Sequence, residues 1–136
     1  NSLSDEILFE DAFNLLISSG EIGIKSACVS ASPQELLEYK LSRANIEQSF
    51  DYIIGGDQVN RNKPYPDIYN KAIAKLGTTK NIIIEDSPTG IKAGKSSNTF
   101  VVAINRGMFT KDDLSEADLI VEELLLENFL SIFKSL

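Results

Sequence analysis

Short apolar runs alternate with longer amphipathic segments along this chain. The apolar runs cover residues 24–29, 50–54, 82–84 and 100–104, with a smaller one at 117–121. Their length and their β-branched content predict short buried strands. Helices are predicted where apolar side chains recur at helical spacing, at residues 4–19, 33–43, 66–76, 88–98 and 127–136. This alternation indicates an α/β fold, in which helices cover both faces of a mostly parallel sheet.

Serine, proline and glycine mark several of the predicted helix ends. Ser32, Pro33 and Glu35 match a capping box with proline at the first helical position, so the first interpretation of Ser32 is a helix cap. Gly20 and Gly23 are expected to end the first helix, with Gly20 suited to the left-handed position that follows a helix, and Gly77 is expected to end the helix at residues 66–76. We therefore expect one helix to begin after Ser32 and two others to end at these glycines.

The composition is typical of an ordinary globular domain. The chain has 136 residues, of which 43% are hydrophobic and 24% are charged, enough for one domain with a core of its own. The net charge is −7 and the basic residues are scattered, which argues against a nucleic-acid surface and a basic membrane patch. No apolar run is long enough to span a bilayer. Binding to nucleic acid or to a membrane is therefore not expected.

The histidine and cysteine counts limit the catalytic mechanisms and the redox setting that this chain can have. The chain has no histidine, which excludes Ser-His-Asp and Cys-His catalysis by these residues alone. Its one cysteine, Cys28, cannot form an internal disulfide, so a reducing cytoplasmic setting is expected. Cys28 lies in an apolar run, and we interpret it as a small buried hydrophobic side chain rather than as a nucleophile.

The most informative stretch is the end of the run at residues 82–84. Glu85 and Asp86 follow it directly, and Ser87 and Pro88 then provide a helix cap and a first helical position. Ligands of open α/β sheets bind at the carboxyl ends of the strands, where two carboxylates can hold Mg²⁺ together with phosphate and water. Taken alone, the acidic pair is more typical of a capped turn than of a metal site.

Two further candidates lie upstream. Ser30 follows the run at residues 24–29, where a hydroxyl and neighbouring amides can meet a phosphate oxygen. Lys63 lies between Asn62 and Pro64, and the proline stiffens this segment. A solvated surface charge is the simpler interpretation of Lys63, and a fixed phosphate contact is the alternative.

Taken in chain order, the stretches around Ser30, Lys63 and Glu85 resemble the second, third and fourth signature motifs of the haloacid dehalogenase superfamily. The resemblance is to its phosphatase and β-phosphoglucomutase-like branch. Val29-Ser30-Ala31-Ser32 is similar to the serine motif at a strand end. Residues 62–69 are similar to the lysine motif K-P-x-P-x-x-[FY], and residues 85–94 to the acidic motif E-D-S-x-x-G-[IV]-x-A. The resemblance extends over essentially the whole chain, residues 1–136, and implies a single Rossmann-like, three-layer core domain.

The resemblance also implies a role for each matching residue. The residues implied in phosphate binding are Ser30, Ala31, Ser32 and Lys63, and those implied in Mg²⁺ binding are Glu85 and Asp86. Ser30 would hydrogen-bond the transferring phosphoryl group and Lys63 would neutralise its charge. The implied function is that of a Mg²⁺-dependent phosphatase or phosphomutase, which acts on a small phosphorylated metabolite through an aspartyl-phosphate. The sequence leaves open both the substrate and the choice between these two reactions.

The family's first motif is missing from this sequence. That motif is a D-x-D on an apolar strand and supplies the nucleophilic aspartate, and no D-x-D occurs in the 136 residues. The chain also lacks an initiator methionine, so we expect the nucleophile strand and the cap domain to lie upstream, with truncation as the preferred explanation. The chain alone is therefore expected to be inactive.

In the family, the absent strand lies at the centre of the sheet, between the strand before Ser30 and the strand at residues 82–84. Without it, both neighbours would expose unpaired edges. We expect another segment or chain to fill the gap, or the two strands to close together. One alternative is a non-catalytic phosphate- and metal-binding or regulatory module that naturally lacks the nucleophile. A receiver-like signalling domain is less favoured, because no phosphoacceptor aspartate follows a strand.

Overall fold

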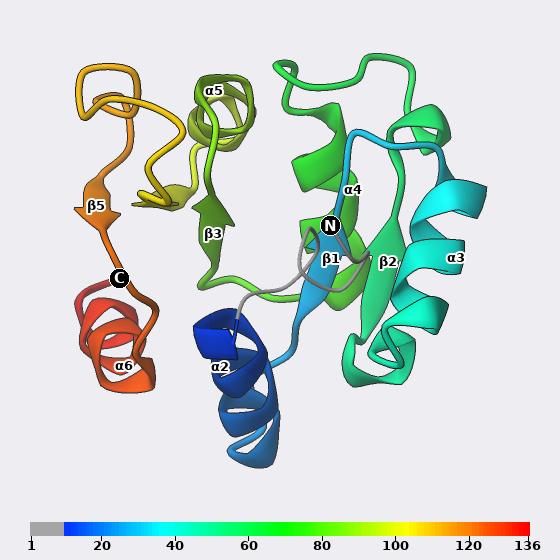
Figure 1. Cartoon of the computed structure of the whole chain (residues 1–136), viewed down its shortest axis with the longest axis horizontal. Helices are drawn as coiled ribbons and strands as arrows, with labels where there is room; N and C mark the ends of the chain where they lie inside the picture. Colours follow the sequence, from blue (N-terminus) through cyan, green and yellow to red (C-terminus); the bar gives the residue numbers. More distant parts are fainter. Residues whose placement is uncertain (1–9) are drawn as a thin grey trace.

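A computed structural model describes residues 10–136 of the chain, in which helices and short strands alternate (Figure 1). The strands are β1 (Ala27–Val29), β2 (Tyr52–Ile54), β3 (Ile82–Glu85), β4 (Phe100–Ile104) and β5 (Leu119–Val121). The helices are α2 (Glu10–Glu21), α3 (Gln34–Arg43), α4 (Asp67–Leu76), α5 (Pro88–Ser96) and α6 (Leu126–Ser135), with two 3₁₀ turns, η1 (Glu47–Ser49) and η2 (Gly56–Gln58). The α/β class predicted from the apolar pattern is confirmed.

All described strand pairs are parallel, and they form two separate sheets. One sheet pairs β1 with β2, and the other has the order β3-β4-β5. Figure 1 shows the two sheets side by side, with β1 and β3 at the edges that face each other. Within the described residues β1 and β3 do not pair, so the alternative in which these two strands close together is wrong. No strand of residues 10–136 pairs with either of the two edges that face each other.

Helices cover both faces of the three-stranded sheet, as the side chains of β4 show. Successive side chains of a strand point to opposite faces. Val101 packs in a core cluster with Ile68 of α4 and Ile91 of α5, whereas the next residue, Val102, packs in a second cluster with Phe129 of α6. The structure is therefore built in three layers, as expected.

The first of these clusters also joins the two sheets. It brings together Ile54 of β2, Ile68 of α4 and Ile83 of β3, each almost fully buried. Burying such a side chain contributes roughly 1.5–3 kcal/mol, so this apolar layer holds the sheets together where no backbone pairing does. The α3 helix packs separately, through Leu37 and Leu41.

Two predicted helix ends are wrong. The α3 helix begins at Gln34 without a side-chain cap from its own N-terminal residues, and the carboxylate of Asp57 accepts the Gln34 amide at 2.8 Å instead of Ser32. The predicted N-cap, Ser32, is therefore one residue before the observed one, Pro33. The α2 helix continues through Gly20, and the left-handed residue is Gly23, with φ 85°. The predicted helix also included residues 4–9, which lie outside the described residues.

Other predicted ends are confirmed. Gly77 ends α4 in the left-handed conformation, with φ 67°. The Ser87 hydroxyl accepts the Gly90 amide at 3.2 Å and caps α5, with Pro88 at the first helical position. Because this cap fixes the direction in which the chain leaves β3, it also fixes the tip that carries Glu85.

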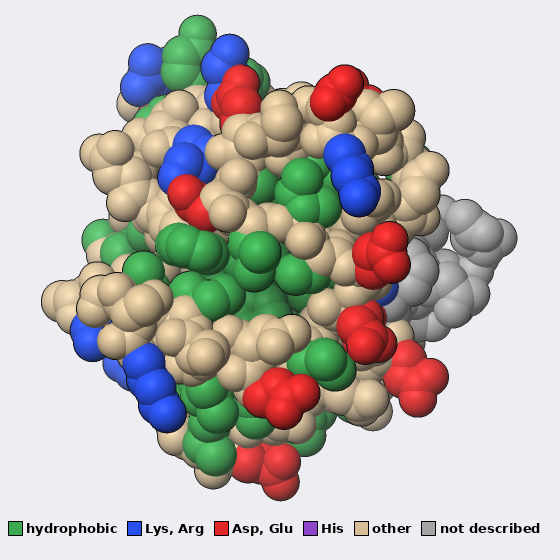
Figure 2. All heavy atoms as spheres, turned by 90° about the vertical axis from the view of Figure 1, so that its left-hand side faces the viewer, with side chains coloured by type: hydrophobic (Ala, Val, Ile, Leu, Met, Phe, Trp, Pro, Cys, Tyr) green, Lys and Arg blue, Asp and Glu red, His purple; other side chains and the backbone are tan. Residues whose placement is uncertain are grey.

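The face beside β5 carries a cluster of apolar side chains in a shallow hollow, with charged side chains scattered around it (Figure 2). β5 is the outer strand of its sheet, and Leu119 is 39% exposed.

Within residues 10–136 no helix is long and apolar enough to cross a membrane.

An ion pair ties α2 to the far end of the chain. The Arg106 guanidinium, after β4, donates two hydrogen bonds to Asp11 at 2.6 and 3.1 Å, and the Leu124 amide donates a third at 2.8 Å. The bonds from Arg106 are the largest influence on the pKa of Asp11, which is lowered.

Replacing Asp11 with Asn should lower the free energy of unfolding by about 1–3 kcal/mol at pH 7, because hydrogen bonds to a charged group are lost. A carboxylate with a lowered pKa stabilises the fold above its unfolded pKa of about 3.9, and this contribution disappears as the pH falls through the folded value. The difference in free energy of unfolding between the unaltered chain and Asp11→Asn, measured in urea, should therefore be smaller at pH 3 than at pH 7. The exposed Asp112→Asn serves as control, and an equal loss in both variants would contradict the prediction.

Candidate active site

A cavity of about 1150 Å³ lies between the two sheets. It extends along the whole length of β1 and β3, from the residues before β1 to the tips of both strands, and side chains of α2 and α6 and Lys63 of the loop before α4 also line it. Ser30, Lys63, Glu85 and Asp86 all contribute to its wall. Parallel strands present their carboxyl ends at one edge of a sheet, which is where open α/β folds bind ligands.

The loop after β1 is held by its own backbone. The Ser30 amide donates to Ile54 O at 3.0 Å and so extends the pairing of β1 with β2. The Ser32 amide donates to Ser30 Oγ at 3.1 Å, which leaves the hydroxyl hydrogen of Ser30 available for a ligand. Ser30 and Ala31 line the cavity, whereas Ser32 does not; the carbonyl of Ser32 accepts the Gly56 amide at 2.8 Å.

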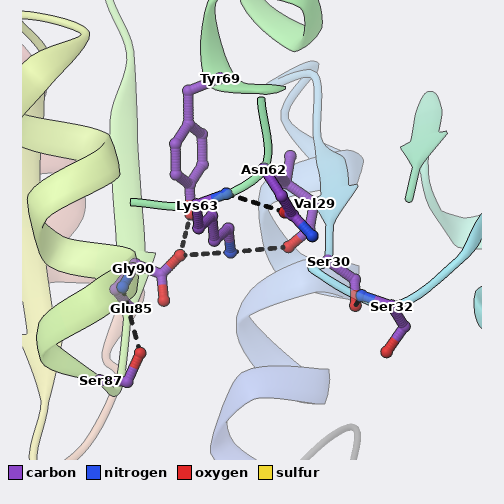
Figure 3. A network of polar contacts seen from close by, with 9 residues as sticks. All are labelled: Val29, Ser30, Ser32, Asn62, Lys63, Tyr69, Glu85, Ser87 and Gly90. Carbon is purple, nitrogen blue, oxygen red and sulfur yellow. Dashed lines mark hydrogen bonds and ion pairs between the residues drawn. The ribbon is translucent and has the colours of Figure 1, made fainter. Parts of the chain in front are cut away.

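Lys63 crosses from its loop to both strands (Figure 3). Its ammonium donates to Glu85 Oε2 at 2.7 Å and to Val29 O at 3.3 Å, and it lies 5.1 Å from the centre of the Tyr69 ring. The Lys63 side chain is only 10% exposed and that of Glu85 only 8%. The interpretation of Lys63 as a solvated surface charge is therefore wrong.

Tyr69 is a member of the site that the sequence analysis did not single out. Its hydroxyl donates a short hydrogen bond to the same oxygen, Glu85 Oε2, from the buried face of α4. Burial, followed by the charge of Glu85, raises the pKa of Tyr69 well above its ordinary value, so the phenol remains a neutral donor. The only sequence signal was the aromatic position of the K-P-x-P-x-x-[FY] pattern, which does not distinguish a phenol from a phenyl ring.

Both donors to Glu85 use one oxygen, and the other oxygen points toward the Ser87 side of the site in Figure 3. Gly90, in the first turn of α5, lies directly against this carboxylate, and a Cβ there would overlap it. A larger residue at this position would therefore displace the Glu85 carboxylate, although the backbone of Gly90 is ordinary helix.

The residues at the tip of β3 suit a hard cation with few protein ligands. Asp86 is exposed and follows Glu85 directly, and its charge is among those that raise the pKa of Tyr69. Within residues 10–136 no group of three metal-ligating side chains is present. Two carboxylates fit Mg²⁺, which is commonly held by one or two carboxylates and completes its shell with water and phosphate oxygens.

Cys28 also lines the cavity, half-buried in β1. Burial raises the pKa of its thiol to about 11, against the opposing effect of the Lys63 charge. The thiol is therefore protonated near neutral pH, which agrees with its interpretation as a small apolar side chain.

Two parallel sheets covered by helices, with hydroxyl, ammonium and carboxylate groups at their strand ends, define an α/β protein of the class whose ligands bind at this edge. The family model of the haloacid dehalogenase-like hydrolases matches residues 4–104. The chain belongs to this family.

Curated relatives include phosphatases. Validoxylamine A 7′-phosphate phosphatase of Streptomyces hygroscopicus subsp. limoneus is 30% identical over 123 residues, which cover 87% of this chain and 56% of that protein. The phosphorylated carbohydrates phosphatase of Thermotoga maritima is 37% identical over 76 residues, 54% of this chain and 35% of that protein. The chain thus spans about half, or less, of the length of these relatives.

Solved structures of phosphate-handling enzymes are also similar to this chain. The β-phosphoglucomutase of Clostridium difficile is similar with a TM-score of 0.82 and 29% identity, over 98% of this chain and 61% of that one. CbbY of Rhodobacter sphaeroides, solved in complex with phosphate, is similar with a TM-score of 0.75 and 25% identity, over 84% of this chain and 53% of that one. The phosphatase and β-phosphoglucomutase-like branch inferred from the motifs is confirmed.

Removing one partner of the buried ion pair should destabilise the fold. Glu85→Gln leaves the Lys63 ammonium without its carboxylate and is expected to lower the free energy of unfolding by about 3 kcal/mol in urea. The double variant Glu85→Gln, Lys63→Met should recover part of this loss, since no unpaired charge remains. Asp86→Asn, one residue away and exposed, should change stability by no more than about 0.5 kcal/mol. Equal losses of unfolding free energy in Glu85→Gln and Asp86→Asn would contradict a stabilising ion pair between Lys63 and Glu85.

The Cys28 thiol should react slowly. With a pKa of about 11, its thiolate fraction at pH 8 is low, and we expect alkylation by iodoacetamide to be roughly 100-fold slower than in concentrated urea. The rate for the folded chain should rise steadily as the pH increases toward 11. A rate at pH 8 equal to that of the unfolded chain would show an ordinary, accessible thiol.

Proposed function

We propose that this chain provides the phosphate- and magnesium-binding part of a phosphoryl-transfer site, which acts on a small phosphorylated metabolite. One observation carries the proposal: Ser30, Lys63 and the Glu85–Asp86 pair, from three separate segments, line the cavity between β1 and β3 where these strands end. The names of the relatives support the substrate class, since they include phosphatases of phosphorylated carbohydrates.

Each group has a task that follows from its chemistry. The Ser30 hydroxyl donates to a phosphoryl oxygen, and the Lys63 ammonium compensates negative charge on the same group as the reaction proceeds. Glu85 fixes the position of that ammonium at 2.7 Å and, with Asp86, offers carboxylate oxygens to Mg²⁺. When bound, Mg²⁺ would supply charge compensation at the transferring group. The protein's part is mainly to position these groups.

The nucleophile of this reaction would come from a strand in the gap between β1 and β3. The Ser30 amide bonds to β2, and alternate residues of a parallel strand face opposite neighbours, so Ala27 and Val29 direct their backbone groups into the gap. Val29 O is accordingly available to Lys63. We infer that one extended segment, parallel to both strands, completes the sheet, with an aspartate at its carboxyl end forming the aspartyl-phosphate.

The side chains around the gap support this occupant. Ile82 and Ile84 of β3 line the cavity together with Leu15 and Leu16 of α2. Ile84 is 38% exposed, which is unusual for an isoleucine of a parallel strand, whereas Leu15 and Leu16 are already buried. An apolar strand seated in the gap would bury Ile84 and pair with both β1 and β3.

Titration of this chain with MgCl₂ in the presence of inorganic phosphate tests the metal site directly. We expect weak binding by calorimetry, and Asp86→Ala should weaken it by at least about tenfold, because a charged oxygen ligand is lost. Asp112→Ala, an acid outside the cavity, is the matched control. Unchanged Mg²⁺ affinity in Asp86→Ala would make the metal assignment wrong.

The reading frame upstream of Asn1 tests the catalytic part of the proposal. If it encodes an apolar strand ending in D-x-D, the longer protein should hydrolyse or isomerise small phosphate esters with Mg²⁺, and Lys63→Met should abolish turnover. A native start close to Asn1, with phosphate and Mg²⁺ binding but no turnover, would instead favour the non-catalytic binding module.

A further inference from the structure

Asn62, the residue before Lys63, connects two of the segments that form the site, and Figure 3 shows its contact with the backbone of Lys63. Its Nδ2 donates to Ala31 O at 3.0 Å, and its Oδ1 accepts the Lys63 amide at 2.8 Å. Both functional groups of one side chain are thus used, one on the loop after β1 and the other on the backbone of Lys63.

A third segment leaves room for this bridge. A Cβ at Gly56 would overlap both Asn62 Nδ2 and Ala31 O, so a larger residue there would separate the two loops. The Gly56 amide also donates to Ser32 O at 2.8 Å, which holds the loop after β1 from its other side. The backbone conformation of Gly56 does not itself require glycine, so the close approach is the reason for a residue without a side chain.

We infer that Asn62 is a positioning residue, which sets the distance between the Lys63 ammonium and the Ser30 hydroxyl. The inference rests on the proposed phosphate site, where both groups would bind one anion. A lysine side chain has four rotatable bonds, so the contacts of the ammonium with Glu85 and Val29 O fix its position relative to Ser30 only if the backbone of Lys63 is also held. Small errors in such a distance matter, since misplacement of positioned groups by about 1 Å can cost a factor of about 100 in reaction rate.

A positioning role differs measurably from a merely structural one. Asn62 is exposed, so its two hydrogen bonds compete with water and should contribute little to global stability. Phosphate affinity should therefore respond to its replacement much more than the unfolding midpoint does.

The experiment follows backbone amide signals of this chain by NMR during titration with inorganic phosphate and MgCl₂. Asn62→Asp keeps the size and the acceptor for the Lys63 amide but turns the donor to Ala31 O into a second acceptor. Asn60→Asp, on the same loop and exposed, makes the same charge change without touching that bond. Asn62→Ala and Asn60→Ala repeat the comparison without added charge.

We expect the phosphate Kd to rise about tenfold in Asn62→Asp and several-fold in Asn62→Ala, and by less than about twofold in the Asn60 variants. Urea midpoints of all four should stay close to that of the starting chain. Equal Kd values in the Asn62 and Asn60 variants, or an affinity loss matched by a lower urea midpoint, would overturn the positioning role of Asn62. Either result would leave the proposed phosphate site unaffected. Absence of phosphate-dependent shifts at Ser30 and Lys63 in the unaltered chain would overturn the proposed phosphate site, and this inference with it.

Discussion

The buried ion pair between Lys63 and Glu85 is the interaction on which the site depends. It joins the loop before α4 to the tip of β3, and the same ammonium reaches Val29 O on β1. Two charges removed from water are unfavourable unless their remaining hydrogen-bonding capacity is used. The phenol of Tyr69 and the carbonyl of Val29 use part of that capacity, so the pair is held in one arrangement.

This arrangement matters because the two sheets are not joined by backbone pairing. Their connection consists of the apolar layer formed by α4 and α5 and of the polar contacts at the strand ends. The site is thus located at a junction between two sheets, where residues far apart in the sequence are brought together. Such a junction suits phosphoryl transfer, since an anion can be reached from both sides at once.

Under the proposed function, the groups gathered at this edge would bind a phosphoryl group and a cation, the parts that different phosphorylated substrates have in common. This is consistent with the variety of the relatives, which include phosphatases and a β-phosphoglucomutase. The chain belongs to the haloacid dehalogenase-like hydrolases through the part of the fold that these proteins share.

The sequence by itself determined the strands, the order of their polar tips and the residue types that gather there, because apolar periodicity, helix caps and motif spacing are local properties. Ser30, Lys63, Glu85 and Asp86 were candidates because of their resemblance to family motifs, and the structure places all four in the wall of one cavity. Tertiary structure alone decided that Tyr69 donates to Glu85, that Asp57 rather than Ser32 caps α3, and that Asn62 bridges to Ala31. These contacts join residues between 16 and 31 positions apart, or depend on a shift of one residue at a helix start, and no local pattern encodes such distances.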